Sequence, residues 1–266
     1  MTQFKTISSR DNPLVKHFAA LSRSAPARKR DGMCLLEGEH LAQSYVDRVG
    51  QLAIIAIRDG TGVGSGALTP AQAALAERST EAVLVAPVLF DSLSTLVSPS
   101  GVLAIATVPP SPPLATNGFV LALDAVQDPG NVGTLIRTAA AAGVAQVWLS
   151  PGCAFAWSVK TLRAAQGAHF HIQVLEDVDL PAALSAFQGE RWATLPRDIG
   201  GVKTVSLFET KFSGSNALVL SNEGHGLSPA VLPALTGGLR IPMAAGVESL
   251  NVATAGAIIL YGIFRQ

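Results

Sequence analysis

Three short segments in the second half of the sequence place polar or charged side chains beside glycine or proline, directly after an apolar run. They are DAVQDPGNVGTLIRTAAAAG at 124–143, LVLSNEGHGLS at 218–228 and IPMAAGVESLN at 241–251. The apolar runs are typical of buried strands, and open α/β sheets build their sites where strands end. One such segment alone could be an ordinary turn. Together, their polar side chains are the first candidates for a site.

The first segment holds an arginine, Arg137, among the Leu, Ile and Ala residues of a helix expected over 132–142. Burying a guanidinium without a partner is costly, so this arginine needs an explanation. Asn131 stands where the helix should begin, and we expect it to cap the helix. Six positions at about 100° per residue place the two residues about 120° apart around the helix, so they need not share a face. Ser249 or Asn251 is expected to open the last helix.

The surrounding sequence alternates between expected strands and helices. We expect a basic helix, a loop at 24–30 and an element of helical spacing over 33–49. Strands are then expected at 52–57, 81–86, 102–108, 119–123, 144–150, 170–175, 191–195, 217–221 and 239–242, and helices at 70–79, 88–96, 132–142, 158–166 and 250–264. The last helix is apolar nearly all round, so we expect it to be buried. The alternation predicts an α/β fold with buried parallel strands.

A proline-rich stretch interrupts this alternation at 108–118. Its sequence, VPPSPPLATNG, holds four prolines and has no hydrophobic period. Such a stretch is typical of a stiff, extended linker. We therefore predict a small α/β domain over 1–107 and a second domain over 119–266.

Charge is distributed unevenly, although the whole chain is neutral. Residues 1–30 carry seven Lys and Arg side chains and one acidic side chain, Asp11. A basic arm of this kind fits the phosphates of a nucleic acid, and equally a solvated helix face. If the arm binds RNA, the expected contacts are Arg10, Lys16, Arg28, Lys29 and Arg30.

Other features exclude several classes of protein. The first ten residues contain no apolar run for a signal peptide, and the apolar stretch at 252–264 is too short to span a bilayer, so we expect a cytoplasmic protein that does not bind membranes. Cys34 and Cys153 lie far apart, which suggests neither a disulfide framework nor a zinc site. We expect both to be small apolar residues.

Two further patterns point only weakly to chemistry. GVGSGA at 62–67 formally fits a dinucleotide fingerprint, but Pro70 follows quickly and no suitable acidic residue comes after it. His169 and His171 would share one face of a strand, and His225 would lie in a loop. Without a clear further ligand set, histidines placed in this way are more often structural than metal-binding.

Taken together, in this order and spacing, the three segments resemble the signature motifs of the SpoU/TrmH family, RNA 2'-O-ribose methyltransferases of the SPOUT superfamily. KTLRAAQG at 160–167 is similar to a further family segment, and LLEGEH at 35–40 and PSGVLAI at 99–105 resemble the family's L30e-like substrate-binding domain. The resemblance covers nearly the whole chain. It implies a parallel-sheet methyltransferase domain whose last helix, beginning near Ser249, is threaded through a loop as a trefoil knot, a topology that most folds avoid.

The resemblance also implies a cofactor, partners and site residues. The cofactor is S-adenosylmethionine, and the partners are RNA, of 23S rRNA type, and a second copy of the methyltransferase domain. The implied catalytic residues are Asn131, Arg137, Glu223, Ser249 and Asn251. The implied cofactor contacts are Thr194, Leu195, Pro196, Leu220, Ser221, Asn222, Glu223, Gly224, Ile241, Pro242, Met243, Leu250, Asn251 and Ala255. Lys160 and Arg163 join the expected RNA contacts.

Methyl transfer to a ribose 2'-OH is an in-line displacement that requires no metal. A guanidinium is a poor proton acceptor at pH 7, so we expect Arg137 to bind phosphate and stabilise the developing alkoxide. Glu223, Ser249 and Asn251 would orient the loop and the hydroxyl. Ser221 and Ala165 stand where the family usually has Gly and Ser. These two departures leave one alternative, an RNA-binding module of the same fold with little or no turnover. A tRNA 2'-O-methyltransferase is a second alternative, because the residues do not distinguish ribosomal from transfer RNA.

Overall fold

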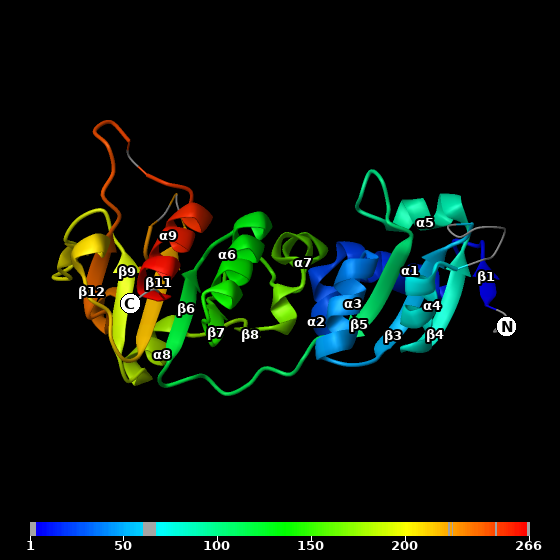
Figure 1. Ribbon diagram of the computed structural model, residues 1–266, viewed down its shortest axis with the longest axis horizontal. Helices are drawn as coiled ribbons and strands as arrows, with labels where there is room; N and C mark the ends of the chain where they lie inside the picture. The colour runs from blue at the N-terminus through cyan, green and yellow to red at the C-terminus, as the bar shows by residue number, and fades with distance from the viewer. Residues whose placement is uncertain (1–3, 61–67, 223, 225, 248, 265–266) are drawn as a thin grey trace. The chain divides into compact units, whose positions relative to one another are not determined.

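The computed structural model of the protein describes residues 4–60, 68–222, 224, 226–247 and 249–264. Contacts divide the chain into two compact units (Figure 1). The first comprises Met1–Pro110 and Trp157–Phe170, and the second comprises Ser111–Ala156 and His171–Gln266. The segment Trp157–Phe170, which lies inside the second domain in sequence, therefore packs with the first unit. The dinucleotide-like GVGSGA pattern lies outside the described residues.

The first unit is a mixed sheet with helices around it. Its strands are β1 (Lys5–Ile7), β2 (Met33–Glu37), β3 (Leu52–Arg58), β4 (Ser79–Val85) and β5 (Val102–Thr107), in the order β1-β4-β3-β5-β2. Its helices are α1 (Pro13–Arg23), α2 (Ala25–Asp31), α3 (Glu39–Arg48), α4 (Pro70–Glu77), α5 (Pro87–Leu93), α7 (Val159–Ala165) and the 3-10 turn η1 (Ala168–Phe170). β5 runs antiparallel to both β3 and β2, whereas β1, β4 and β3 are parallel. One core cluster joins α1, α5 and the sheet.

Three expectations for this unit are wrong. The segment at 24–30 is helix α2 and not a loop, because Ser24 accepts a hydrogen bond from the Ala27 backbone and proline occupies the first turn. The element expected over 33–49 is strand β2 followed by helix α3, with Gly38 at φ 108° between them. His169 and His171 share no strand, since His169 belongs to η1 and the next strand starts at Gln173.

The second unit is built on one fully parallel sheet. Its strands are β6 (Phe119–Asp124), β7 (Gln146–Leu149), β8 (Gln173–Leu175), β9 (Glu190–Thr194), β10 (Thr204–Ser206), β11 (Asn216–Ser221) and β12 (Gly237–Arg240), in the order β10-β12-β9-β11-β6-β7-β8. Its helices are α6 (Pro129–Ala141), α8 (Leu180–Ala186), α9 (Val252–Phe264) and the 3-10 turns η2 (Leu207–Glu209) and η3 (Leu232–Ala234). The predicted α/β fold with parallel strands is confirmed.

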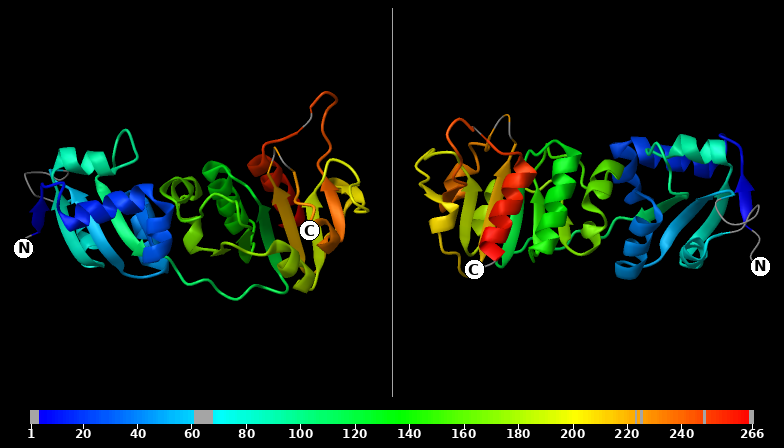
Figure 2. Two further views of the ribbon diagram at one scale, coloured as in Figure 1. Left: turned by 180° about the vertical axis from the view of Figure 1, so that it is seen from behind. Right: turned by 45° about the horizontal axis from the view of Figure 1, so that its top comes forward.

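Both faces of this sheet are covered. Helices α6 and α9 lie together on one face (Figures 1 and 2). On the other, a core cluster joins Trp148 of β7, Leu184 of α8 and Ala234 of η3. Alternate residues of each strand therefore enter different layers. The threaded knot, and the L30e-like character of the first unit, stay predictions of the resemblance.

The apolar sequence of helix α9 predicts that the helix is buried on all sides, and this prediction is wrong. Val252, Ile259 and Leu260 are buried, but Thr254 is exposed and Tyr261 keeps 42% of its surface exposed. An apolar helix with an exposed stripe has one face that the unit itself does not cover. Among the described residues, no helix combines the length and apolar character needed to cross a membrane.

The two cysteines are both free thiols. Cys34 is fully buried on β2, and burial raises the pKa of its thiol to about 12. Cys153 is half-buried, donates to the Leu123 carbonyl at 3.2 Å, and also has a raised pKa because of burial. Neither thiol has the lowered pKa of a reactive cysteine.

Candidate active site

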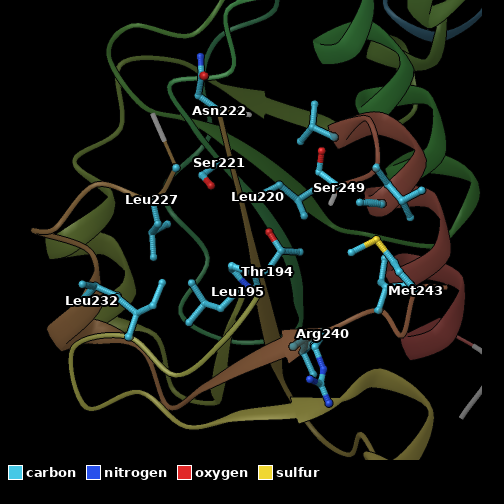
Figure 3. A pocket seen from close by; sticks show the side chains of 18 residues that line it. Thr194, Leu195, Leu220, Ser221, Asn222, Leu227, Leu232, Arg240, Met243 and Ser249 are labelled. Atoms are coloured by element: carbon cyan, nitrogen blue, oxygen red, sulfur yellow. The ribbon is translucent and has the colours of Figure 1, made fainter. Parts of the chain in front are cut away.

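A pocket of about 430 Å³ lies where strands β9, β11 and β12 reach their carboxyl ends. Thr194 ends β9, Ser221 ends β11 and Arg240 ends β12, and all three line the pocket (Figure 3). The start of α9 supplies Val252 and Ala255. The volume is in the range typical of small-molecule sites. The pocket therefore occupies the edge at which parallel α/β sheets place their ligands.

The walls of this pocket are mainly apolar, with a few polar groups. Leu195, Leu220 and Leu239 supply part of the apolar surface. The polar side chains around the pocket are Thr194, Ser221, Asn222, Arg240 and Ser249, four of them neutral (Figure 3). Within the described part of the lining, Arg240 carries the only charge. Such a pocket suits a largely apolar ligand group with a small number of oriented hydrogen bonds.

The structure brings most of the implied cofactor contacts together in this pocket. Those that line it are Thr194, Leu195, Pro196, Leu220, Ser221, Asn222, Ile241, Met243, Leu250 and Ala255. Gly224, Pro242 and Asn251 do not line it. Glu223 lies outside the described residues, as does His225. Of the implied catalytic residues, Ser249 lines the pocket itself.

Several lining residues were not predicted. Gly226 and Leu227 lie in the second signature segment, so their position could have been inferred from it. Ile199 and Leu232 lie outside all three segments and have no signal in the sequence. Both pack against the core cluster on the α8 side of the sheet.

Asn251 connects the two helices that flank the site. Its Oδ1 accepts hydrogen bonds from the Ala253 and Thr254 backbone, at 3.0 and 3.2 Å, so Asn251 caps α9 as expected. Its Nδ2 donates to Oδ1 of Asn131 at 3.0 Å. Asn131 itself does not cap α6. Asp128 does, accepting the Asn131 backbone N–H at 2.7 Å, which leaves the Asn131 side chain to meet Asn251.

Close packing holds α9 on α6 and β11. A Cβ added to Gly256 would meet Leu135 of α6 and would come within 2.8 Å of Leu220 of β11. Real Cβ atoms do not approach this closely, so only glycine allows the observed contact. The hydrogen bond between Asn131 and Asn251 and this contact together fix α9, and with it the pocket wall at Val252 and Ala255.

Arg137 projects from α6 into solvent, six positions after Asn131. It is exposed rather than buried among the Leu and Ala residues around it. Its guanidinium forms no hydrogen bond and no ion pair with any other residue that the structure describes. Arg137 is thus a cation available to a ligand, on the same helix as the Asn131 link.

The implied RNA contacts of the first unit differ in exposure. Arg10, Lys16, Lys29, Arg30 and Lys160 are exposed, although Lys16 pairs with Asp11 at 3.1 Å and Arg30 with Asp31 at 2.7 Å. Arg163 is half-buried and donates to Thr95 Oγ1 at 3.1 Å.

Arg28 is the exception, because it is only 6% exposed. Its Nη1 donates to the Leu21 carbonyl at 2.6 Å and to the Ser22 carbonyl at 3.4 Å. These carbonyls lie in the last turn of α1, where helices lack internal donors. The expectation that Arg28 faces RNA therefore does not fit its surroundings: its cation stabilises the end of a helix.

Metal binding has no support in the described ranges, which contain no group of three or more His, Cys, Asp or Glu side chains placed to hold an ion. His169 is buried and packs against Trp157, with ring centroids 5.0 Å apart. Its position is that of a core residue of the first unit.

Comparison with known proteins identifies the family of the chain. The model of the SpoU rRNA Methylase family matches residues 118–261, which include the pocket and α6. The chain is 35% identical over 265 residues to the 23S rRNA (guanosine(2553)-2'-O)-methyltransferase RlmP of Bacillus subtilis, covering 97% of this chain and 98% of that protein. It is 36% identical over 276 residues to an uncharacterised tRNA/rRNA methyltransferase of Synechocystis, covering 98% and 94%.

Solved structures agree with these matches. An AdoMet-bound rRNA methyltransferase from Sinorhizobium meliloti superposes with a TM-score of 0.84 at 26% identity, over 99% of this chain and 98% of that one. An RNA methyltransferase of the TrmH family from Porphyromonas gingivalis gives a TM-score of 0.78 at 29% identity, over 95% and 97%. Sequence motifs, pocket and relatives agree: the chain belongs to the SpoU rRNA methylase family.

Proposed function

We propose that the protein transfers a methyl group from S-adenosylmethionine to a ribose 2'-OH of RNA. The observation that carries the proposal is the link between a ligand-sized pocket and an exposed arginine. The pocket wall on α9 is tied through Asn251 and Asn131 to α6, the helix that presents Arg137. A cofactor in the pocket and a phosphate on Arg137 would thus be held by one rigid pair of helices.

The residues of the pocket fit S-adenosylmethionine. Its apolar walls suit an adenine ring, and Thr194 and Ser221 can supply hydrogen bonds to polar ligand atoms. Ser221, where the family usually has glycine, is half-buried at the pocket wall, so its small side chain is the one that a bound cofactor must accommodate. When bound, the cofactor supplies an electrophilic methyl group on a sulfonium.

The chemistry that remains for the chain is positioning and charge stabilisation. Arg137 would bind the phosphate beside the target ribose and stabilise the developing alkoxide, while the 2'-OH proton would pass to water. A guanidinium is a poor proton acceptor, so we propose this electrostatic role for Arg137 and not that of the base. Ser249 at the pocket and Asn251 at the start of α9 would orient the hydroxyl. The role of Glu223 stays a prediction.

We propose rRNA as the substrate, and 23S rRNA in particular. The similarity to RlmP over nearly the full length of both proteins supports this choice, because it includes the first unit as well as the family domain. We assign RNA binding to the first unit, where Lys29, Arg30 and Lys160 are exposed. Such a substrate would place the reaction in the cytoplasm. A tRNA substrate is the second candidate, supported by the Synechocystis relative.

We further propose a homodimer formed through the second unit. On α9, Thr254, Ala257, Ile258 and Tyr261 follow one another at helical spacing and are exposed or half-buried. Phe208 of η2, which is 69% exposed, lies in a turn that packs against α9. This apolar surface is the part of the second unit best suited to self-association.

An RNA-binding module without turnover is the rival function. Two departures from the family pattern favour this rival, Ala165 and Ser221. Ala165 is fully buried in the first unit and does not line the pocket, so only Ser221 could affect cofactor binding directly. Calorimetric titration with S-adenosylmethionine tests the pocket. Incubation with tritiated cofactor and RNA from a strain lacking the protein then tests turnover. Binding followed by label in RNA supports the enzyme, whereas RNA binding without label supports the module.

A further inference from the structure

Asp124, the last residue of β6, has a carboxylate that the chemistry above does not use. The residue is only 4% exposed, and a buried carboxylate needs hydrogen-bond donors. Both donors come from one residue 104 positions away: the Ser228 backbone N–H at 2.7 Å and the Ser228 hydroxyl at 2.9 Å. Within the described part of the chain, the carboxylate pairs with no cation. Its partner is therefore a loop and not a counter-ion.

The backbone of Asp124 holds the other end of the same loop. Asp124 is paired with Ser221 in the parallel β6–β11 ladder, and its carbonyl accepts the Asn222 N–H at 3.0 Å. Inside the loop, the Asn222 carbonyl accepts the Gly226 N–H at 2.9 Å. Asp124 thus holds the segment 222–228 at both of its ends.

This segment forms part of the pocket wall. Asn222, Gly226 and Leu227 line the pocket, and the predicted catalytic position 223 lies between them in sequence. A change at Asp124 would therefore be felt at the pocket, although Asp124 does not line it.

The chain on the other side of Asp124 is also fixed. Ala125 has φ of 53°, a left-handed conformation that is unfavourable for a residue with a Cβ. Its N–H donates to Ser150 Oγ at 2.9 Å, and its carbonyl accepts the Asn222 side chain at 3.1 Å. The sharp turn that results leads directly to Asp128 and helix α6. The 222–228 loop and the entry to α6 therefore share a single anchor.

We infer that Asp124 is a positioning residue, which through Ser228 holds the 222–228 loop in the shape that binds the cofactor. This inference rests on the proposed function, because it takes the pocket as the site of S-adenosylmethionine. It assigns no contact between Asp124 and the ligand. The chemistry is that of a buried, charge-assisted hydrogen bond that fixes a loop before the ligand binds.

Asp124→Asn tests the inference with almost no change of volume. The amide can still accept the Ser228 N–H through its oxygen and donate its NH₂ to the Ser228 hydroxyl oxygen, so this variant removes the negative charge that strengthens both hydrogen bonds while it keeps their geometry. We expect the Kd for S-adenosylmethionine to rise about tenfold, the scale of replacing two charge-assisted hydrogen bonds by neutral ones. The KM for the cofactor should rise more than kcat falls. Peptides covering 222–228 should exchange amide hydrogens faster in the absence of ligand, with 146–149 of β7 unchanged.

Substitutions at Ser228 separate positioning from general damage to the fold. Ser228→Ala keeps the N–H but removes the hydroxyl, so one oxygen of the buried carboxylate loses its donor, and the effect on Kd and exchange should have the same direction. Ser228→Thr keeps the hydroxyl and should restore much of the affinity that alanine loses. Asp179→Asn is the matched control, because Asp179 is an exposed cap of α8, bonded to the Ala182 backbone at 3.1 Å, and asparagine caps helices equally well.

Faster exchange confined to 222–228, with weaker cofactor binding in both Asp124→Asn and Ser228→Ala, would support the inference. Wild-type exchange and wild-type affinity in both variants would overturn it. If Asp124→Asn does not fold, Ser228→Ala decides between these outcomes. A wild-type protein that binds no S-adenosylmethionine would refute the proposed function, and the exchange measurement would still decide whether Asp124 holds the loop.

Discussion

Two arginines that the sequence marks as functional lie in opposite surroundings. Arg28 of α2 belongs to a dense basic run, yet it is 6% exposed and its guanidinium donates to carbonyls at the end of α1. Arg137 of α6 is a single cation in an apolar sequence, yet it is exposed and has no partner among the described residues. The number of basic residues in a segment therefore does not indicate which of them can bind a ligand. The burial and the hydrogen-bond partners of each side chain determine whether it is available.

The largest effect expected from this contrast is at Arg137. Arg137→Ala should lower kcat by about 100-fold or more, the scale of removing one preorganised donor from a transition state. The affinity for S-adenosylmethionine should be nearly unchanged, because Arg137 does not line the pocket. Arg137→Lys should recover only part of the activity, since it keeps the charge but not the planar fork that binds phosphate through two hydrogen bonds.

Sedimentation of the Arg137→Ala protein is the control for assembly. We expect it to match the wild-type protein, because a stable interface draws on many residues. Full turnover in the alanine variant would contradict the catalytic role. A loss of turnover that appears only in dissociated protein would assign Arg137 to assembly instead.

Arg28→Ala should have the opposite profile, with a loss of stability and little direct loss of RNA affinity. Removing a buried cation that satisfies two helix-end carbonyls should destabilise the first unit by about 1–3 kcal/mol. Hydrogen exchange of peptides from α1 and β2 would report it as faster opening. Arg30→Ala is the matched control, since Arg30 is exposed, and it should leave exchange unchanged. Equal exchange in the two variants would remove the distinction between them.

A smaller effect is expected from the exposed cations of the first unit. Replacing Lys29, Arg30 and Lys160 together with alanine should weaken RNA binding and make it less dependent on salt. The slope of log binding constant against log salt concentration should fall by about 0.7–0.9 for each phosphate that the variant no longer neutralises. Binding of S-adenosylmethionine should not change, because the pocket lies in the second unit. An unaltered salt slope would mean that these side chains form a solvated face.

The parts of the fold that could be predicted are those whose signal is local. The apolar runs of β6 and β11 and the polar residues that follow them define the parallel sheet and its site edge, and ten of the implied cofactor contacts do line one pocket. Asn251 could be placed as a helix cap because amide side chains next to an apolar helix are typical of caps. Asn131 was misplaced by the same rule, because Asp128, three positions earlier, competes for the cap.

The parts that could not be predicted depend on partners distant in sequence. Arg28 looks like any surface cation until α1 is folded beside it. The packing of Trp157–Phe170 with the first unit depends on contacts such as Tyr45 with Phe170, whose ring centroids lie 5.3 Å apart. The bond between Asp124 and Ser228 joins two signature segments, and nothing in either segment indicates that it forms.

The central claim is that a ribose 2'-OH is the nucleophile, and it is tested most directly on matched RNA substrates. Methyl label from S-adenosylmethionine should appear at one nucleotide, whose 3' phosphodiester should resist alkaline cleavage. An otherwise identical oligonucleotide with 2'-deoxyribose at that nucleotide should accept no label, while it still binds the protein. Label on a base, or methylation of the deoxy substrate, would contradict the account.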